Sequence, residues 1–473
     1  MKKHIILVSS LVFFSGCSLL KQDPNIPNIN MPITQEQSSE EKAMLNDKWW
    51  ENFNDTELNS FVEYSLKNNS DLQIAILKVQ KFREFLNIKK SDQFPTIDAT
   101  AGAVHKRTSH YTPPSNQGST YESYDLGLKA SFEIDLFGKL SNAKKGAFED
   151  MLQQHYIKEM IRQRIISDSV VAYYGLQTNH SLYDIAKAQY LDQLERYNHT
   201  QHRYENGMVE KSVLLQEESL LQMYKSEMLS YGEILNNYKT AVSILIGKDT
   251  KEIFESSNLE LKMINYDSTK FIVPMSLPSE ILQKRADIKA SEAKVKSSAF
   301  SVSVARSAYF PSLSLTGTLG YVSGDLDRLV TSNASNYSIG GNLLSPIFNY
   351  GRISANIENA KIDQKIALIE YNDTVRKAFG DIKDALSSYS TNKEKLVSYE
   401  KRYSAIKEKS DIYQEQYNEG FISHLEFLEV RKEVYSVAMQ KESSMFETLK
   451  SVVNVYYNLG GGFDINKDTI NIQ

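Results

Sequence analysis

A set of glycines occurs twice in this chain at a constant spacing, and this internal repeat limits the possible folds more than any other feature. Gly138 recurs as Gly351 and Gly207 recurs as Gly420, in each case 213 positions further on, as from 138 to 351. Because the offset is constant over about 110 residues, neither copy carries an insertion relative to the other. We therefore expect the two copies to fold as the same structural unit.

The positions of the ten prolines show where long helices can form. No proline occurs between Pro114 and Pro274 or after Pro346, and proline breaks the interior of a helix. We therefore expect very long helices over residues 139–205 and 352–418. About 67 residues with a rise of 1.5 Å each span roughly 100 Å.

Each long helix is expected to turn back near Gly207 or Gly420 into a second helix, and to be preceded by a shorter one over 58–93 or 279–309. After the first turn, apolar residues recur at steps of three and four, the pattern of a coiled-coil seam. They are Leu221, Tyr224, Met228, Tyr231, Leu235, Tyr238, Val242 and Leu245. We expect these side chains to be packed against a neighbouring helix.

Apolar and polar residues alternate over 126–136 and 313–321, and a period of two is typical of a strand with one apolar face. The hairpins are expected over 95–137 and 311–346, with polar loops at 109–120 and 323–336. Such strands suit either a transmembrane barrel or a soluble sheet with one buried face. Four strands leave open edges, which hydrocarbon does not tolerate, so a barrel needs further chains. Two chains give eight strands and a filled bore, whereas three give twelve and leave a passage.

The N-terminus has the pattern of an export signal over residues 1–16. Lys2 and Lys3 precede an apolar run from Ile5 to Phe14, which is too short to span a bilayer because that takes roughly 20 residues. Ser15 and Gly16 then precede Cys17, the only cysteine of the chain. This ending resembles a bacterial lipoprotein processing site, so we expect a covalent lipid on Cys17; the alternative is a plain signal peptide with an incidental cysteine.

Composition and motifs exclude several classes of function. The formal net charge is -5, so the chain lacks the excess of positive charge that is typical of nucleic-acid-binding proteins. His199 and His202 are spaced to share a metal, but two further ligands are not evident, and a solvated pair is the simpler interpretation. No phosphate-binding glycine loop and no Gly-x-Ser-x-Gly motif occur. We expect neither an enzyme nor a metal or other cofactor.

Several short motifs together resemble the OprM/CmeC branch of the TolC-like outer-membrane factors, the exit ducts of tripartite efflux pumps. The matching stretches are Lys48-Trp49-Trp50, Asn69-Ser70-Asp71-Leu72, Leu277-Pro278-Ser279, Phe310-Pro311-Ser312-Leu313, Pro346-Ile347-Phe348, Gly351-Arg352 and the two Tyr-x-x-Gly turns. One departure is Lys284-Arg285-Ala286, where the branch usually has two arginines and a proline. The motifs cover nearly all of the chain that follows the signal.

The resemblance implies an α+β membrane protein: a homotrimer whose twelve-stranded β-barrel, with four strands per chain, continues into a long α-helical barrel in the periplasm. It further implies attachment to the outer-membrane lipid of a Gram-negative bacterium, a periplasmic adaptor and an inner-membrane RND transporter as partners. The expected organisation is a signal at 1–16, an anchored segment at 17–57, repeats at 58–247 and 277–462, an equatorial linker at 248–276 and a tail at 463–473.

The resemblance also places functional residues at the turns. Glu426 and Glu429 match the acidic constriction of the family, and Leu425 matches an apolar gate position. The first repeat has Val213 and Gln216 at the equivalent offsets, so only the second repeat supplies carboxylates there. The alternative is that two glutamates one turn apart form a solvated helix face. TolC itself has an arginine lock two residues after the turn glycine, where this chain has Ile422.

Exposed apolar residues at the turns are expected to dock the adaptor. The candidates are Tyr204, Gly207, Met208 and Val209 in the first turn, and Tyr417, Gly420, Phe421 and Ile422 in the second. The alternative is that they only cap the helices. The expected function is a passive exit duct for multidrug efflux; the rival hypotheses are a non-conducting coiled-coil spacer, or a duct for metal ions or secreted protein.

Overall fold

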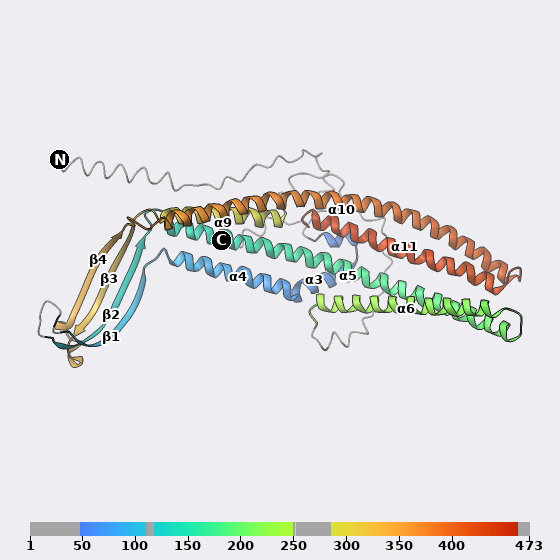
Figure 1. Cartoon of the computed structure of the whole chain (residues 1–473), viewed down its shortest axis with the longest axis horizontal. Helices are drawn as coiled ribbons and strands as arrows, with labels where there is room; N and C mark the ends of the chain where they lie inside the picture. The colour runs from blue at the N-terminus through green and yellow to red at the C-terminus, as the bar shows by residue number, and fades with distance from the viewer. Residues whose placement is uncertain (1–47, 110, 112–117, 249–250, 252–284, 462–473) are drawn as a thin grey trace. The chain divides into compact units, whose positions relative to one another are not determined.

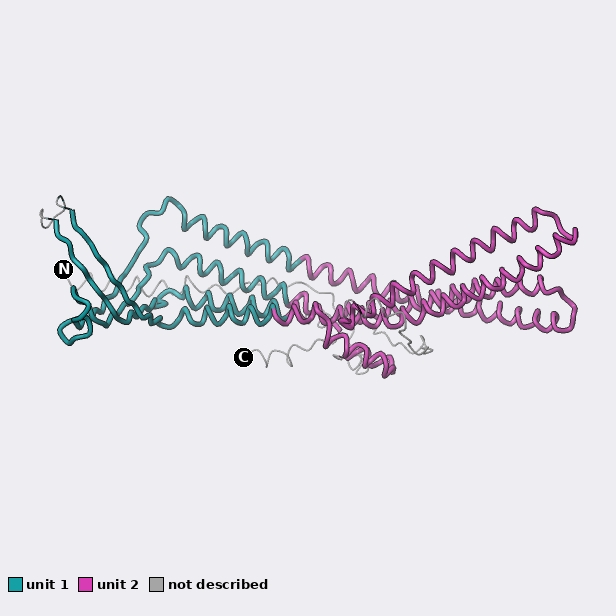
Figure 2. Tube along the Cα trace, turned by 90° about the horizontal axis from the view of Figure 1, so that it is seen from below, with its two compact units in different colours: residues 1–28, 78–155, 290–372 teal, residues 29–77, 156–289, 373–473 magenta. Residues whose placement is uncertain are grey.

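The computed structural model describes residues 48–109, 111, 118–248, 251 and 285–461. Cys17, the signal and most of the expected equatorial segments lie outside these residues. The chain divides into two compact units, which are coloured in Figure 2. The described parts of unit 1 are residues 78–155 and 290–372, and the described parts of unit 2 are residues 48–77, 156–289 and 373–461, less the gaps given above. Each unit combines segments from both repeats.

Unit 1 contains a four-stranded antiparallel sheet in the order β1-β2-β3-β4 (Figure 1). The strands are β1 (Thr96–Arg107), β2 (Thr120–Ile134), β3 (Ser312–Ser323) and β4 (Ser335–Leu344). Both hairpins predicted from the alternating pattern are therefore present. Short 3-10 turns, η4 (Leu326–Arg328) and η5 (Ser332–Ala334), occupy the loop between β3 and β4.

The register of the sheet places apolar side chains on one face across all four strands. Ala99 pairs with Leu128, Leu128 with Leu319, and Leu319 with Tyr337. Because side chains alternate between the faces along a strand, this row lies on one side of the sheet, and all four of its side chains are exposed. The neighbouring row on the opposite face is polar, and consists of Asp98, Lys129, Thr318 and Ser338.

Two helices have the full length expected for the proline-free tracts. They are α5 (Lys139–Glu205) and α10 (Arg352–Asn418), with 67 residues each. Each returns through a short turn into a helix of 35 residues, α6 (Lys211–Leu245) or α11 (His424–Asn458). Among the described residues, none of the helices is both long and apolar enough to span a membrane.

The expected helix over 58–93 is wrong in one respect, because the chain forms two helices there. α3 (Thr56–Asn68) ends at Asn69, and α4 (Ser70–Ser91) begins directly after it. The Asn69 backbone is extended, and its side-chain oxygen accepts a hydrogen bond of 2.9 Å from the amide of Asp71. Asn69 therefore ends one helix and caps the next. In the second repeat, α9 (Ala286–Ser307) fills most of the expected 279–309, whose first six residues lie outside the described part.

The core of unit 2 is built around aromatic residues that precede α3. Trp49 and Trp50 belong to the 3-10 turn η1 (Trp49–Phe53) and are almost fully buried. They form one cluster with residues of α3, α5, α10 and α11, among them Leu58, Val62, Tyr173, Tyr174, Ile382, Leu449, Val452 and Tyr456. Much of the predicted seam of α6 is also buried, at Leu221, Tyr224, Leu235 and Val242.

Candidate functional site: the helix turns and the polar network beside them

The turn between α5 and α6 is closed by a glycine in the left-handed region. Gly207 has φ +70°, its amide donates to the carbonyl of Tyr204 at 2.9 Å, and the amide of Met208 donates to Arg203 at 2.8 Å. This pair of bonds is a Schellman motif, which satisfies the last carbonyls of a helix. The turn between α10 and α11 has the same pattern around Gly420, with φ +80°. The structure thus confirms both predicted glycine turns.

The turns expose the apolar residues that the sequence analysis selected. Met208 is 68% exposed, Phe421 is 75% exposed and Tyr204 is also exposed. Val209 and Ile422 are half-buried. A helix cap requires none of these large side chains, so each turn presents an apolar surface to its surroundings.

Tyr417 has a different environment from Tyr204, its equivalent in the first repeat. Its ring is half-buried and stacks on Phe427, with centroids 5.5 Å apart and an interplanar angle of 3°. The ring of His424 lies 5.2 Å away from it. Tyr417 therefore fixes the start of α11 against the end of α10.

Glu426 caps the first turn of α11. The Ser423 amide and hydroxyl donate to Oε2 of Glu426 at 2.8 and 2.9 Å, and the amide of Glu426 donates to the Ser423 hydroxyl at 3.3 Å. This is a capping box. The bonds from the Ser423 backbone and side chain hold the pKa of Glu426 below its usual value of 4.5. Leu425, beside it, is half-buried.

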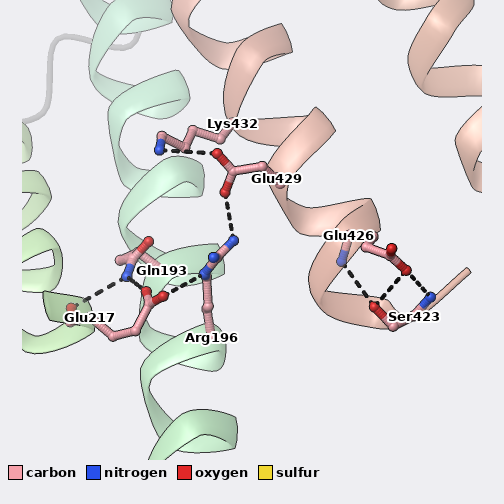
Figure 3. A network of polar contacts seen from close by, with 7 residues as sticks. All are labelled: Gln193, Arg196, Glu217, Ser423, Glu426, Glu429 and Lys432. Atoms are coloured by element: carbon pink, nitrogen blue, oxygen red, sulfur yellow. Dashed lines mark hydrogen bonds and ion pairs between the residues drawn. The ribbon is translucent and has the colours of Figure 1, made fainter. Parts of the chain in front are cut away.

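Glu429, one turn further along α11, belongs to a network that joins the two pairs of helices (Figure 3). Its Oε2 lies 2.6 Å from Nη1 of Arg196 on α5, and its Oε1 lies 3.3 Å from Nζ of Lys432. Nε of Arg196 lies 3.0 Å from Oε1 of Glu217 on α6. Nε2 of Gln193 donates to Oε2 of Glu217 at 2.7 Å. The two glutamates predicted for one site thus have different partners in this chain.

A second polar contact between α5 and α11 lies nearby. The hydroxyl of Tyr435 donates to Oδ2 of Asp192 at 2.9 Å, and Nε of Arg431 lies 3.1 Å from the same oxygen. Burial raises the pKa of Asp192, and the Tyr435 hydrogen bond and the Arg431 charge oppose this. Asp192 and Arg196 were not among the residues predicted from sequence, because a contact between segments more than 200 residues apart has no local signal.

The described residues contain no group of three or more His, Cys, Asp or Glu side chains placed to hold a metal ion. His202 lies 3.6 Å from Glu205 on the same helix, which accounts for the polar environment of that histidine. The described turns and the network beside them thus consist of apolar surfaces and ion pairs.

Comparison with known proteins identifies the family. The family model described as "Outer membrane efflux protein" matches residues 62–231 and 277–461, and the chain belongs to this family. It is 25% identical over 478 residues to the solvent efflux pump outer membrane protein SrpC of Pseudomonas putida, covering 99% of this chain and 100% of the relative. It is 24% identical over 469 residues to the probable outer membrane lipoprotein SilC of Salmonella typhimurium, with coverage of 98% and 99%.

A solved structure supports the same assignment. The CmeC outer membrane channel of Campylobacter jejuni superposes with a TM-score of 0.82 at 29% identity, covering 94% of this chain and 96% of that chain. The chain is thus an outer-membrane protein that serves as the exit duct of an efflux system. The fold class and the family that its motifs predicted are confirmed.

Proposed function

We propose that three copies of this chain form a passive channel that a periplasmic adaptor opens and an inner-membrane RND transporter drives, for the export of multiple drugs. The observation that carries this proposal is the sheet. Its apolar row at Ala99, Leu128, Leu319 and Tyr337 is exposed, and β1 and β4 are its open edges. Edges in hydrocarbon must be paired, and twelve strands leave a passage where eight do not.

A lipid on Cys17 would attach the chain to the outer membrane. One relative, SilC, is named as a lipoprotein, and Cys17 follows a signal of the lipoprotein kind. A single acyl chain gives only marginal, reversible binding, so the sheet would supply most of the membrane attachment. A Cys17→Ser variant would lose the mass of the lipid and should still insert.

The periplasmic gate is assigned to Leu425, Glu426 and Glu429. In a trimer, Glu426 and Glu429 contribute six carboxylates around one axis. These like charges repel one another and attract cations. We expect a narrow, cation-preferring mouth when no adaptor is bound. The support for this assignment is the position of both glutamates in the first turns of α11, close to the turn that ends α10.

Adaptor docking is assigned to both turns, and their exposed apolar residues support it. The surface consists of Tyr204, Gly207, Met208, Val209, Tyr417, Gly420, Phe421 and Ile422. The glycines shape the turns, whereas Met208 and Phe421 are the most exposed of the large side chains. A partner that covers them gains the burial of apolar area.

Single-channel conductance in planar bilayers tests the proposed function. We expect the purified protein to give a small, cation-selective conductance that increases and loses selectivity in the Glu426→Ala, Glu429→Ala double variant. Glu419→Ala is a control for nearby charge, because Glu419 is exposed at the same turn but is outside the proposed gate. If neither the wild type nor the double variant conducts as a verified trimer, the proposed passive channel with an acidic gate is excluded.

A further inference from the structure

A cavity of about 640 Å³ lies between the first pair of helices, α5 and α6, and the second pair, α10 and α11. All four helices contribute side chains to its wall, and these side chains belong to unit 2. Small-molecule sites in proteins commonly have volumes of roughly 300–1,000 Å³. We propose that this cavity binds a monovalent organic cation with an apolar body.

The part of the wall that α6 contributes has two aromatic rings with a carboxylate between them along the helix. Tyr224, Glu227 and Tyr231 follow one another at steps of three and four residues and line the cavity. Residues at these steps lie on one face of a helix. Tyr224 is buried, whereas Glu227 and Tyr231 are half-buried. A ligand in the cavity therefore meets aromatic and acidic groups on the same side.

An apolar cluster supplies a surface for the body of the ligand. Met439 of α11 lines the cavity and is buried together with Leu182 and Ala186 of α5, and Tyr231 packs against this cluster. The packing holds the Tyr231 ring in place, while the flexible thioether of methionine adapts to different apolar shapes. A ligand that covers these groups gains the burial of apolar area.

The charges that α10 and α11 contribute to the wall are paired with one another. Nζ of Lys409 on α10 lies 2.8 Å from Oε2 of Glu433 on α11. Nζ of Lys432 lies 3.3 Å from Oε1 of Glu429, whose other carboxylate oxygen contacts Arg196 (Figure 3). Both carboxylates that α11 contributes to the wall therefore have a cation beside them already.

Glu227 differs from these two glutamates, because it takes part in no hydrogen bond or ion pair with the described residues. Its charge acts on the neighbouring ring: burial raises the pKa of Tyr231, and the negative charge of Glu227 raises it further. The phenol therefore stays neutral at pH 7, and the face of a neutral aromatic ring attracts cations. The carboxylate without a counter-ion and the two rings together favour a positively charged ligand.

The wall fits an organic cation better than a metal ion. A hard metal ion needs several oxygen ligands, and the described residues contain no group of three or more His, Cys, Asp or Glu side chains placed to hold one. One carboxylate balances one positive charge, and aromatic rings bind quaternary ammonium groups well. The expected ligands are quaternary ammonium ions, phosphonium ions and cationic dyes. Such a site goes beyond the proposed passive duct, since it prefers one class of compound.

Two ions of similar shape and opposite charge test this site without a measurement of conduction. Tetraphenylphosphonium and tetraphenylborate differ in the sign of their charge, so a comparison separates charge recognition from apolar partitioning. The purified protein is dialysed to equilibrium against each ion in a non-ionic detergent, with detergent alone as the reference. We expect the protein to retain tetraphenylphosphonium above the reference level and tetraphenylborate only at that level.

Substitutions on α6 locate the bound cation. Glu227→Gln should weaken tetraphenylphosphonium binding by about tenfold, because the ligand loses its counter-ion. Tyr231→Leu keeps an apolar side chain against Met439 but removes the ring, and should weaken binding by about threefold. Glu233→Gln removes an exposed carboxylate of α6 that does not line the cavity, and should bind like the wild type. Thermal unfolding midpoints identify any variant that is misfolded.

Equal retention of the two ions by the wild type would overturn the site, and so would unchanged tetraphenylphosphonium binding in Glu227→Gln. If Glu426→Gln weakens binding as much as Glu227→Gln does, the proposed gate holds the cation and the cavity does not. Dialysis does not depend on conduction. A protein that binds tetraphenylphosphonium as expected but does not conduct would therefore keep the site and count against the proposed channel.

Discussion

The indole ring of Trp49 lies parallel to the phenol ring of Tyr456, with the ring centroids 4.9 Å apart and an interplanar angle of 7°. The two residues are separated by more than 400 positions, and both are buried. The contact attaches η1 to the C-terminal part of α11. It thus fixes the start of the described chain in the core of unit 2.

Replacing Trp49 tests how much this contact contributes to stability. Trp49→Ala should cost about 3–5 kcal/mol, the usual range for removing a buried aromatic side chain. Among the described residues, the indole nitrogen of Trp49 has no hydrogen-bond partner, so Trp49→Phe keeps a stacking ring and breaks no such bond. Trp49→Phe should therefore lower the free energy of unfolding clearly less than Trp49→Ala does. Thermal unfolding followed by circular dichroism measures both, and equal midpoints for the two variants would contradict the role of the ring.

Among the glycines of the sheet, Gly320 has the least room for a side chain. A Cβ atom on Gly320 would overlap the carbonyl oxygen of Leu126 and the Cα of Gly127 on the adjacent strand. Gly320→Ala should therefore disrupt the pairing of β2 with β3 and reduce the amount of folded protein in the outer membrane. Heat-dependent mobility in SDS gels measures this folding.

Gly317 provides the matched control for that position because it lies on the same strand. The nearest atom to an added Cβ there is the Ser338 carbonyl oxygen at 3.9 Å, so Gly317→Ala should fold like the wild type. A normal heat-dependent shift in Gly320→Ala would show that the strands can move apart at low cost.

The capping box predicts a pH dependence at the start of α11. The pKa of Glu426 is lowered in the folded protein, so its contribution to stability is complete above the usual value of 4.5 and is lost as the pH falls through the depressed folded pKa. Glu426→Ala should lower the unfolding midpoint at pH 7, and its difference from the wild type should shrink at about pH 3.

Glu210 supplies the control, because it occupies the cap position of α6 without a cap hydrogen bond from its side chain. Glu210→Ala should have a smaller effect at pH 7. A Glu426→Ala effect that is the same at both pH values would rule out the ionised cap as its cause.

The exposed turns predict a variant that conducts but does not export. Met208→Ser with Phe421→Ser removes the two most exposed apolar side chains of the proposed docking surface, while the glycine turns and the Arg196 network remain. We expect normal conductance in bilayers together with loss of drug export in cells. Ile412→Ser changes an exposed residue of α10 before the turn, and should export normally. Normal drug export by the double variant would show that Met208 and Phe421 are not needed for docking of the adaptor.

The sequence by itself determined the elements of this fold. The proline-free tracts predicted α5 and α10 with their observed ends, and the alternating pattern predicted the strands, because both depend on local periodicity. The repeated glycines located the turns, since a left-handed backbone favours glycine. The break at Asn69 escaped detection because asparagine also occurs inside helices, and only its extended backbone ends α3.

Only the tertiary structure decided what the residues near the turns contact. From sequence, Glu426 and Glu429 are an equivalent pair one turn apart, yet the first bonds to Ser423 and the second to Arg196. The first contact is local and could have been found from the spacing of Ser423 and Glu426, which fits a capping box. The contact of Glu429 with Arg196 joins positions 233 residues apart. Such a contact depends on how two hairpins pack, and that packing leaves no trace in local periodicity.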